Sequence, residues 1–240
     1  MKIFNWSNLR LALMFAMVVF LYSFTSQRNE RRKLFKSEVV FLDDGNPFIK
    51  RETVNKLLIE NKTDASGIQK DKLDLNKLEK SVNKNEMIEK SEVFVSIDGV
   101  LKAVVKQKTP IARAFDESGS FYIDYQGDIM PLSEEFTARV PIISGEISKQ
   151  NKDDLNKLLR FVYDDAFLKK NIIGIQILPG GSLKMMSRDF NYEIEFGKAL
   201  NMERKFGNYK AFYQKAVLDS SLDHYKKINL KFTQQVVCTK

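Results

Sequence analysis

The residue types that most often carry acid–base or metal chemistry are scarce in this 240-residue chain, which has one histidine, His224, and one cysteine, Cys238. A zinc site of cysteine and histidine ligands cannot be assembled from one of each, and no intrachain disulfide can form. Ser220, Ser221, Asp223 and His224 have the residue types of a hydrolase triad. A triad draws its members from distant elements, however, whereas these four lie within five positions. We interpret them as a surface turn.

Pairs of adjacent acidic residues are the other candidates for catalysis: Asp43-Asp44, Glu134-Glu135, Asp153-Asp154 and Asp164-Asp165. Neighbouring side chains point to opposite faces of a strand and diverge by about 100° on a helix, so neither layout places two carboxylates around one substrate bond. Residues 179–181 (PGG) lack the lysine and the following helix of a phosphate loop, and they indicate a hairpin turn. The sequence therefore predicts no catalytic, cofactor-binding or metal-binding residues.

The charge balance, 39 Lys+Arg against 31 Asp+Glu, gives a net charge of +8. The charges are interspersed, and neither a basic stripe nor a nucleic-acid-binding module is recognisable, which argues against nucleic acid as a partner. The densest basic run, residues 28–36, follows an apolar segment and favours contact with anionic lipid headgroups.

That apolar segment, residues 11–24, is the one long uncharged stretch. Extended back to Ile3 it would span roughly 33 Å as a helix, which matches a bilayer core. It is either an uncleaved anchor or a cleaved signal peptide, and we favour the anchor because residues 22–25 (YSFT) match a small-residue cleavage site poorly. Charge leaves the orientation open, since a long exported body can cross largely regardless of the positive-inside rule.

Periodicity after the anchor predicts an α+β chain. A strand at 38–42, a helix within 50–60, a helix capped by Asp74, and a hairpin of strands 93–97 and 100–107 give the order β-α-α-β-β. The polar stretch 61–72 separates the two helices. In the alternation of the first hairpin strand, Ile97 follows Val93 and Val95 on the same face.

A second region begins near Pro110. It is predicted to hold a hairpin (121–124 and 128–132), an amphipathic helix (154–167), strands at 172–178, 182–186 and 192–196, and a second helix around Phe206 and Tyr209. A closing strand is predicted from Ile228 through Val237.

Four short motifs are similar to elements of one bacterial protein family. Residues 103–115 end in a pattern close to acidic-x-x-Pro-x-Ala-x-aromatic, with Gln107 where the acid is usual, so any role of that carboxylate is absent here. Residues 122–127 (YIDYQG), 140–145 (VPIISG) and 227–232 (KINLKF) are similar to "Val-Asp-x-x-Gly", "Leu-Pro-x-x-x-Gly" and "Val-Asp-Leu-Arg-Tyr" elements. In this order and spacing they resemble the FtsQ/DivIB cell-division proteins.

The resemblance implies an α+β architecture in five parts. These are a cytoplasmic tail (1–10), the core of a transmembrane anchor (11–25), a charged juxtamembrane linker (26–37), a polypeptide-transport-associated (POTRA)-like domain (38–109) and a mixed β domain with two helices (110–240). It also implies a single-pass inner-membrane protein of the division septum, with its C-terminal domains in the periplasm. Cys238 would then be an unpaired thiol in an oxidising compartment.

The resemblance further implies a non-enzymatic scaffold of the divisome that links early and late division proteins, with no cofactor and no small-molecule substrate. In the family the final strand region receives FtsB/FtsL-type partners. A free strand edge can be completed by another chain, and here the edge carries neither proline nor charge. The predicted binding residues are Phe232, Thr233, Gln234, Gln235, Val236 and Val237, although the same residues could simply complete a sheet.

A second implied role concerns the POTRA-like unit, which contributes to septal localisation in the family and offers the hairpin 93–107 as a docking edge. Two other classes stay open at this point. One is an anchored secretion or envelope-assembly component with a POTRA unit, and the other is a periplasmic hydrolase acting on the cell wall.

Overall fold

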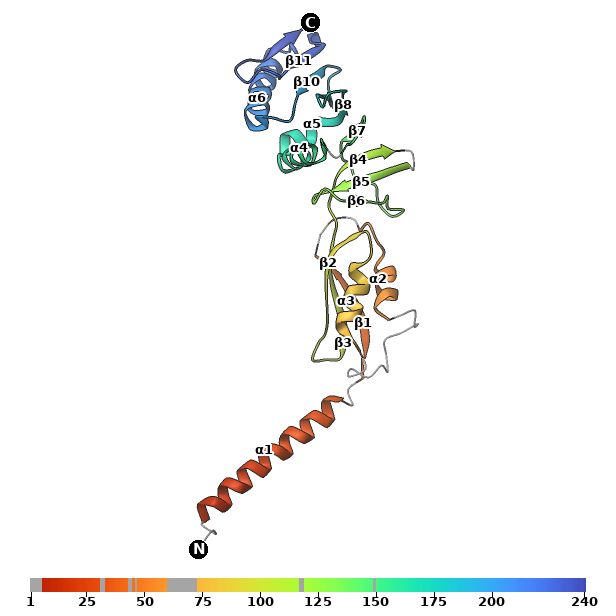
Figure 1. Ribbon diagram of the computed structural model, residues 1–240, viewed down its shortest axis with the longest axis vertical. Coiled ribbons are helices and arrows are strands. Elements are labelled where there is room, and N and C mark those ends of the chain that lie inside the picture. The colour runs from red at the N-terminus through yellow and green to blue at the C-terminus, as the bar shows by residue number, and fades with distance from the viewer. Residues whose placement is uncertain are drawn as a thin grey trace. The chain divides into compact units, whose positions relative to one another are not determined.

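The computed structural model describes residues 6–30, 33–42, 45, 47–59, 73–116, 119–148 and 150–240, and it confirms the α+β class. The chain divides into two compact units, residues 1–107 and 108–240 (Figure 1). The polar stretch 61–72 and the pair Asp43-Asp44 lie outside the described residues.

The first element is a long helix, α1 (Trp6–Glu30). Within it, the 21 residues Asn8–Arg28 are long and apolar enough to cross a membrane. Its large hydrophobic side chains, such as Phe15 and Phe20, are exposed to the surroundings rather than packed in a protein core. Length and composition therefore agree with the predicted anchor.

The rest of the first unit has the predicted element order. A three-stranded sheet consists of β1 (Lys36–Phe41), β2 (Ile88–Val95) and β3 (Val100–Gln107), with α2 (Arg51–Leu58) and α3 (Leu75–Asn83) between the first two strands. The strand order is β1-β3-β2, with β1 parallel and β2 antiparallel to β3. The order β-α-α-β-β is thereby confirmed.

Alternation along these strands builds the core of the unit. One sheet face buries Val39, Val93, Leu101, Ala103 and Val105 against the helix residues Val54, Leu58, Leu78 and Val82. The predicted cap is present, because the Asp74 carboxylate accepts from the Lys77 amide at 3.0 Å. The side chain of Gln107 is buried and accepts from the Phe48 amide at 2.7 Å, so this neutral amide has a structural role where the family pattern has an acid.

The hairpin between β2 and β3 corrects one prediction. Strand β2 ends at Val95, and residues 96–99 form the turn, closed by a hydrogen bond from the Gly99 amide to the Ser96 carbonyl at 3.0 Å. Gly99 has φ +80°, which suits glycine. Ile97 is predicted to continue the strand alternation of Val93 and Val95, but it lies in the turn and is 87% exposed.

The second unit is built on one long mixed sheet. Its strands are β4 (Pro110–Asp116), β5 (Gly119–Asp124), β6 (Ile129–Met130), β7 (Ile142–Ser144), β8 (Ile172–Ile177), β9 (Leu183–Ser187), β10 (Glu193–Gly197), β11 (Lys227–Asn229) and β12 (Val237–Thr239). Their order is β12-β11-β10-β9-β8-β7-β4-β5-β6. Its helices are α4 (Lys152–Asp164), α5 (Ala166–Asn171) and α6 (Met202–Leu218), followed by a short 3-10 helix, η2 (Leu222–His224).

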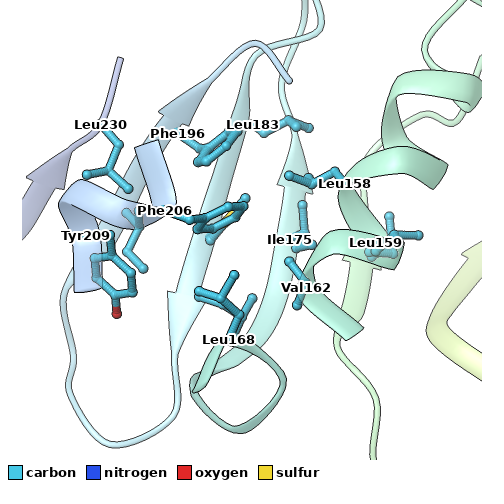
Figure 2. Packing of buried hydrophobic residues seen from close by; sticks show 14 of the residues in the cluster. Leu158, Leu159, Val162, Leu168, Ile175, Leu183, Phe196, Phe206, Tyr209 and Leu230 are labelled. Carbon is cyan, nitrogen blue, oxygen red and sulfur yellow. The ribbon is translucent and has the colours of Figure 1, made fainter. Parts of the chain in front are cut away.

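The helices cover one face of this sheet. Figure 2 shows Phe206 and Tyr209 of α6 beside Phe196 and Leu230, while Leu158 and Val162 of α4 lie toward Ile175. The strand registers place a row of side chains on the covered face, and this row is Ile143, Ile175, Met185, Ile194, Ile228 and Cys238. The core therefore extends to the last strand.

The helix predicted at 154–167 is two helices. Asp165 has extended backbone angles between α4 and α5, and its carboxylate accepts from the Phe167 and Leu168 amides at 3.1 and 3.0 Å. It is also paired with the Lys210 ammonium. An aspartate that caps the following amides begins a new helix. The amphipathic pattern predicted as one helix at 154–167 therefore covers most of α4 and the start of α5.

The motif at 122–127 is a turn held by its aspartate. The buried Asp124 carboxylate accepts from the Gln126 and Asp128 amides at 2.9 and 2.8 Å and lies 3.1 Å from the Lys108 ammonium. Gly127 has φ +89°, and a Cβ there would lie 2.3 Å from the Asn156 side chain. The aspartate and the glycine of this motif therefore serve the fold.

The motif at 140–145 ends in a close approach between two strands. Gly145 has φ +93°, and a Cβ added there would lie 2.2 Å from the Ile177 carbonyl oxygen. Only glycine fits this position without displacing the backbone of β8.

Candidate partner-binding edge at strand β12

The predicted binding residues do not form one strand. Strand β11 ends at Asn229, the chain turns, and β12 returns antiparallel to β11. Phe232, Thr233, Gln234, Gln235 and Val236 lie in this connection, and Val237 begins β12. The prediction of a single strand from Ile228 through Val237 was wrong.

Local hydrogen bonds explain where the strand ends. The Asn229 side chain accepts from the Lys231 amide at 2.9 Å, a local bond that competes with a strand ladder. The Thr233 carbonyl then accepts from the Asn208 side chain of α6 at 3.0 Å. The connection is thereby held against the helix before β12 begins.

Strand β12 is the last strand of the sheet, and within the described residues its outer side pairs with no other strand. The Thr239 carbonyl faces β11, because it accepts from the Lys226 amide at 2.8 Å. The backbone groups of successive residues point to alternate sides of a strand. The N–H and C=O of Val237 therefore also face β11, while those of Cys238 point outward. We call this outward side of Val237–Thr239 the β12 edge.

The side chains of β12 alternate at right angles to these backbone groups. Cys238 lies at the end of the covered core row and is half-buried, and burial raises the pKa of its thiol. Val237 and Thr239 are exposed on the opposite, uncovered face. An added strand would therefore meet an apolar side chain and a hydroxyl on this face and a half-buried thiol on the other.

Charged residues flank the edge on the uncovered face. Glu195, in the same cross-strand row as Val237, accepts from the Lys231 ammonium at 2.7 Å and lies 4.0 Å from that of Lys227. The hydrogen bond from Lys231, together with these nearby ammonium groups, lowers the pKa of the Glu195 carboxyl. Glu193 pairs with Lys184 at 3.0 Å. These three lysines outnumber the two glutamates, and the resulting positive charge favours an acidic partner segment over a basic one.

Two hollows share part of their lining after β10, and the smaller one also reaches the turn after β11. The smaller, of about 330 Å³, is lined in part by Gly197, Asn201, Lys205, Lys231 and Thr233. The larger, of about 950 Å³, lies between the start of α4 and the β8–β9 turn, and shares Lys198 and Leu200 with the smaller one.

Lys205 is the one charged side chain of the smaller hollow that is almost fully buried. Its ammonium donates to the carbonyls of Phe196 and Lys198, at 2.9 Å each, and lies 4.6 Å from the centre of the Phe196 ring. Burial lowers the pKa of this ammonium. Its contacts tie the end of β10 to the first turn of α6, which is a structural role.

The hydrolase-type residues lie on a surface turn after α6. Ser220 has φ +48°, Ser221 donates to the Ala216 carbonyl at 3.3 Å, and Asp223 and His224 belong to η2. Among the described residues, no group of three or more His, Cys, Asp or Glu side chains could hold a metal ion. The Ser221 hydroxyl is thus bonded to the end of α6.

The comparison with protein families is decisive for this unit. A model of the family described as FtsQ/DivIB, C-terminal related, matches residues 109–239. The chain belongs to the FtsQ/DivIB family. The match ends at Thr239 and so includes β11, the connection and the β12 edge.

Two known proteins show further similarity. The cell division protein FtsQ of Salinibacter ruber is 24% identical over 156 residues, which cover 59% of this chain and 60% of that protein. The major extracytoplasmic domain of the division protein DivIB from Geobacillus stearothermophilus, in its trans isomer, is 17% identical with a TM-score of 0.34. That match covers 47% of this chain and 95% of that domain.

Family membership places this chain among cell-division proteins. Helix α1 has the length and apolarity of a membrane span, and together these findings indicate a membrane-anchored division protein. The sequence prediction placed the free edge at residues 232–237, whereas the edge strand β12 is Val237–Thr239. It did not include Cys238, whose backbone N–H and C=O point outward. Asn229 was the available signal for the end of β11, because asparagine favours turns.

Proposed function

We propose that this protein is a non-enzymatic scaffold of the divisome that binds FtsB/FtsL-type partners by strand addition at the β12 edge. Backbone hydrogen bonds to Cys238 would supply affinity, and contacts with Val237 and Thr239 on one face would supply selectivity. The protein would thus link early and late division proteins at the septum.

The observation that carries this proposal is the position of β12 at the margin of the sheet. Its inner side is paired with β11 in register, so the strand is already extended, while its outer side has no pairing strand among the described residues. A partner segment would gain backbone bonds without reordering this edge.

Two further features belong to the proposal. We place the N-terminus in the cytoplasm and both folded units in the periplasm. We also assign the POTRA-like unit, built on the sheet β1-β3-β2, a contribution to recruitment at midcell. We propose residues 38–109 and 110–240 as the bounds of its two domains.

The experiment is co-purification of the tagged full chain from crosslinked dividing cells, with mass spectrometry of the attached proteins. We expect small coiled-coil division proteins of the FtsB/FtsL type to be enriched. Enrichment of outer-membrane-assembly or secretion components instead would contradict the proposal and favour the envelope-assembly function.

A further inference from the structure

The tip of the β2–β3 hairpin is tied to the segment that follows α1. The Phe35 amide donates to the Gly99 carbonyl at 2.8 Å. A Cβ added to Gly99 would lie 3.1 Å from the Lys33 carbonyl oxygen, so the two backbones are in close contact. The tip therefore moves with residues 33–35.

Chain length keeps this tip near the end of the apolar helix. The span window ends at Arg28, and α1 continues to Glu30, a rise of about 3 Å. The three further residues to Lys33 can extend by at most about 11 Å. If α1 crosses a bilayer, Lys33 lies within about 14 Å of the end of its apolar window, and the headgroup layer occupies part of that distance. The hairpin tip lies next to Lys33, which Gly99 contacts.

The exposed side chains at the tip are unusual for a turn in water. Ile97 is 87% exposed and Phe35 is 71% exposed. Turns usually carry Gly, Pro, Asn, Asp or Ser at their exposed positions, and a bulky β-branched residue there has no folding reason. Two large apolar side chains so close to a span match the depth of the membrane interface.

The surrounding charges favour the same surface. Lys33 and Lys36 are exposed beside Phe35, and Arg28, Arg31 and Arg32 precede them in the sequence. Asp98 is the acidic residue of the turn itself. A basic segment with apolar anchors is typical of binding to anionic lipid headgroups.

We propose that Phe35 and Ile97 insert into the interface of the anionic bilayer that α1 crosses, so that the first folded unit is held against the membrane by its hairpin tip. This inference rests on α1 as a membrane span and is independent of the β12 edge. It gives the unit a membrane-facing end and leaves the opposite end of its sheet for other contacts.

The test uses the single tryptophan of the chain. In a Trp6→Phe background, Ile97→Trp places a fluorophore at the tip of the full chain, reconstituted in vesicles of phosphatidylcholine and phosphatidylglycerol with brominated acyl chains. Leu42→Trp is the matched control, because Leu42 is 62% exposed and follows β1 at the end away from the tip. Val18→Trp, within α1, reports insertion of the span.

We expect the bromolipids to quench the Ile97→Trp emission at least about twofold more than that of Leu42→Trp. Exchange of phosphatidylglycerol for phosphatidylcholine should reduce this difference. If Val18→Trp is quenched while Ile97→Trp matches Leu42→Trp, the tip does not touch the bilayer and the proposal is overturned. If Val18→Trp is not quenched, α1 is not inserted and the proposal also fails, now at its premise.

Discussion

Replacing Cys238 by proline is expected to weaken binding of an FtsB/FtsL-type partner by about 10- to 100-fold. Proline removes the outward N–H of β12, and its ring occupies the space that an added strand would need. The pairing with β11 is made by Val237 and Thr239, so it should survive. Proline is tolerated on edge strands for this reason.

The matched control is Cys238→Ala, which also removes the half-buried thiol but keeps the outward N–H. We expect the alanine variant to bind the partner nearly as the parent does, and both variants to melt within a few degrees of it. Titration of each full-length variant in detergent against the purified partner measures the affinities. Equal binding by the proline variant would exclude backbone pairing at this edge.

Replacing Gly145 by alanine is expected to destabilise the second unit by about 3–5 kcal/mol. The left-handed backbone at φ +93° costs an alanine about 1–2 kcal/mol. The remainder comes from the added Cβ, which would lie 2.2 Å from the Ile177 carbonyl oxygen and force β8 to shift. For a unit of this size we expect the melting temperature to fall by about 10 °C or more.

Gly180→Ala separates the two causes of this loss. Gly180 has φ +83°, but no atom lies within 4 Å of an added Cβ, so only the backbone cost applies. We expect its melting temperature to fall by only a few degrees. Thermal unfolding of both full-length variants measures the difference, and equal losses would show that the contact with Ile177 has no energetic weight.

Local patterns were sufficient to predict the first unit. The spacing of Leu78 and Val82 after a capping Asp74 defined α3, and the Asp98-Gly99 turn placed the hairpin. These signals lie within a few residues of one another, so no distant contact was needed to interpret them. Ile97 was the exception, because its alternation continued into a turn.

The second unit was harder to predict because distant contacts decide its boundaries. Asp165 interrupts one amphipathic pattern and begins a new helix, where Lys210 of α6 pairs with it. Strand β7 is only three residues long, and it is a strand because it pairs with β4 on one side and β8 on the other. Both partners are distant in sequence, so no local pattern predicts it. A run of apolar and amide residues after Ile228 is typical of a strand, yet Asn208 holds it as a connection.

The family motifs also explain why sequence alone could not place the proposed binding edge. Asp124, Gly127 and Gly145 hold turns and a close strand contact, so they identify the fold rather than the partner surface. In the proposed mode of binding, the β12 edge would act through backbone groups, which any residue except proline supplies. Its position therefore follows from the sheet order and not from a side-chain signature.

The central claim is tested most directly by hydrogen exchange of the individual amides of β12, measured by NMR on the full chain with and without the purified FtsB/FtsL-type partner. The account predicts that the Cys238 amide exchanges rapidly alone and becomes protected on binding. The amides of Val237 and Thr239, already bonded to β11, should change far less. Unchanged exchange at Cys238 in a saturated complex would contradict strand addition at this edge.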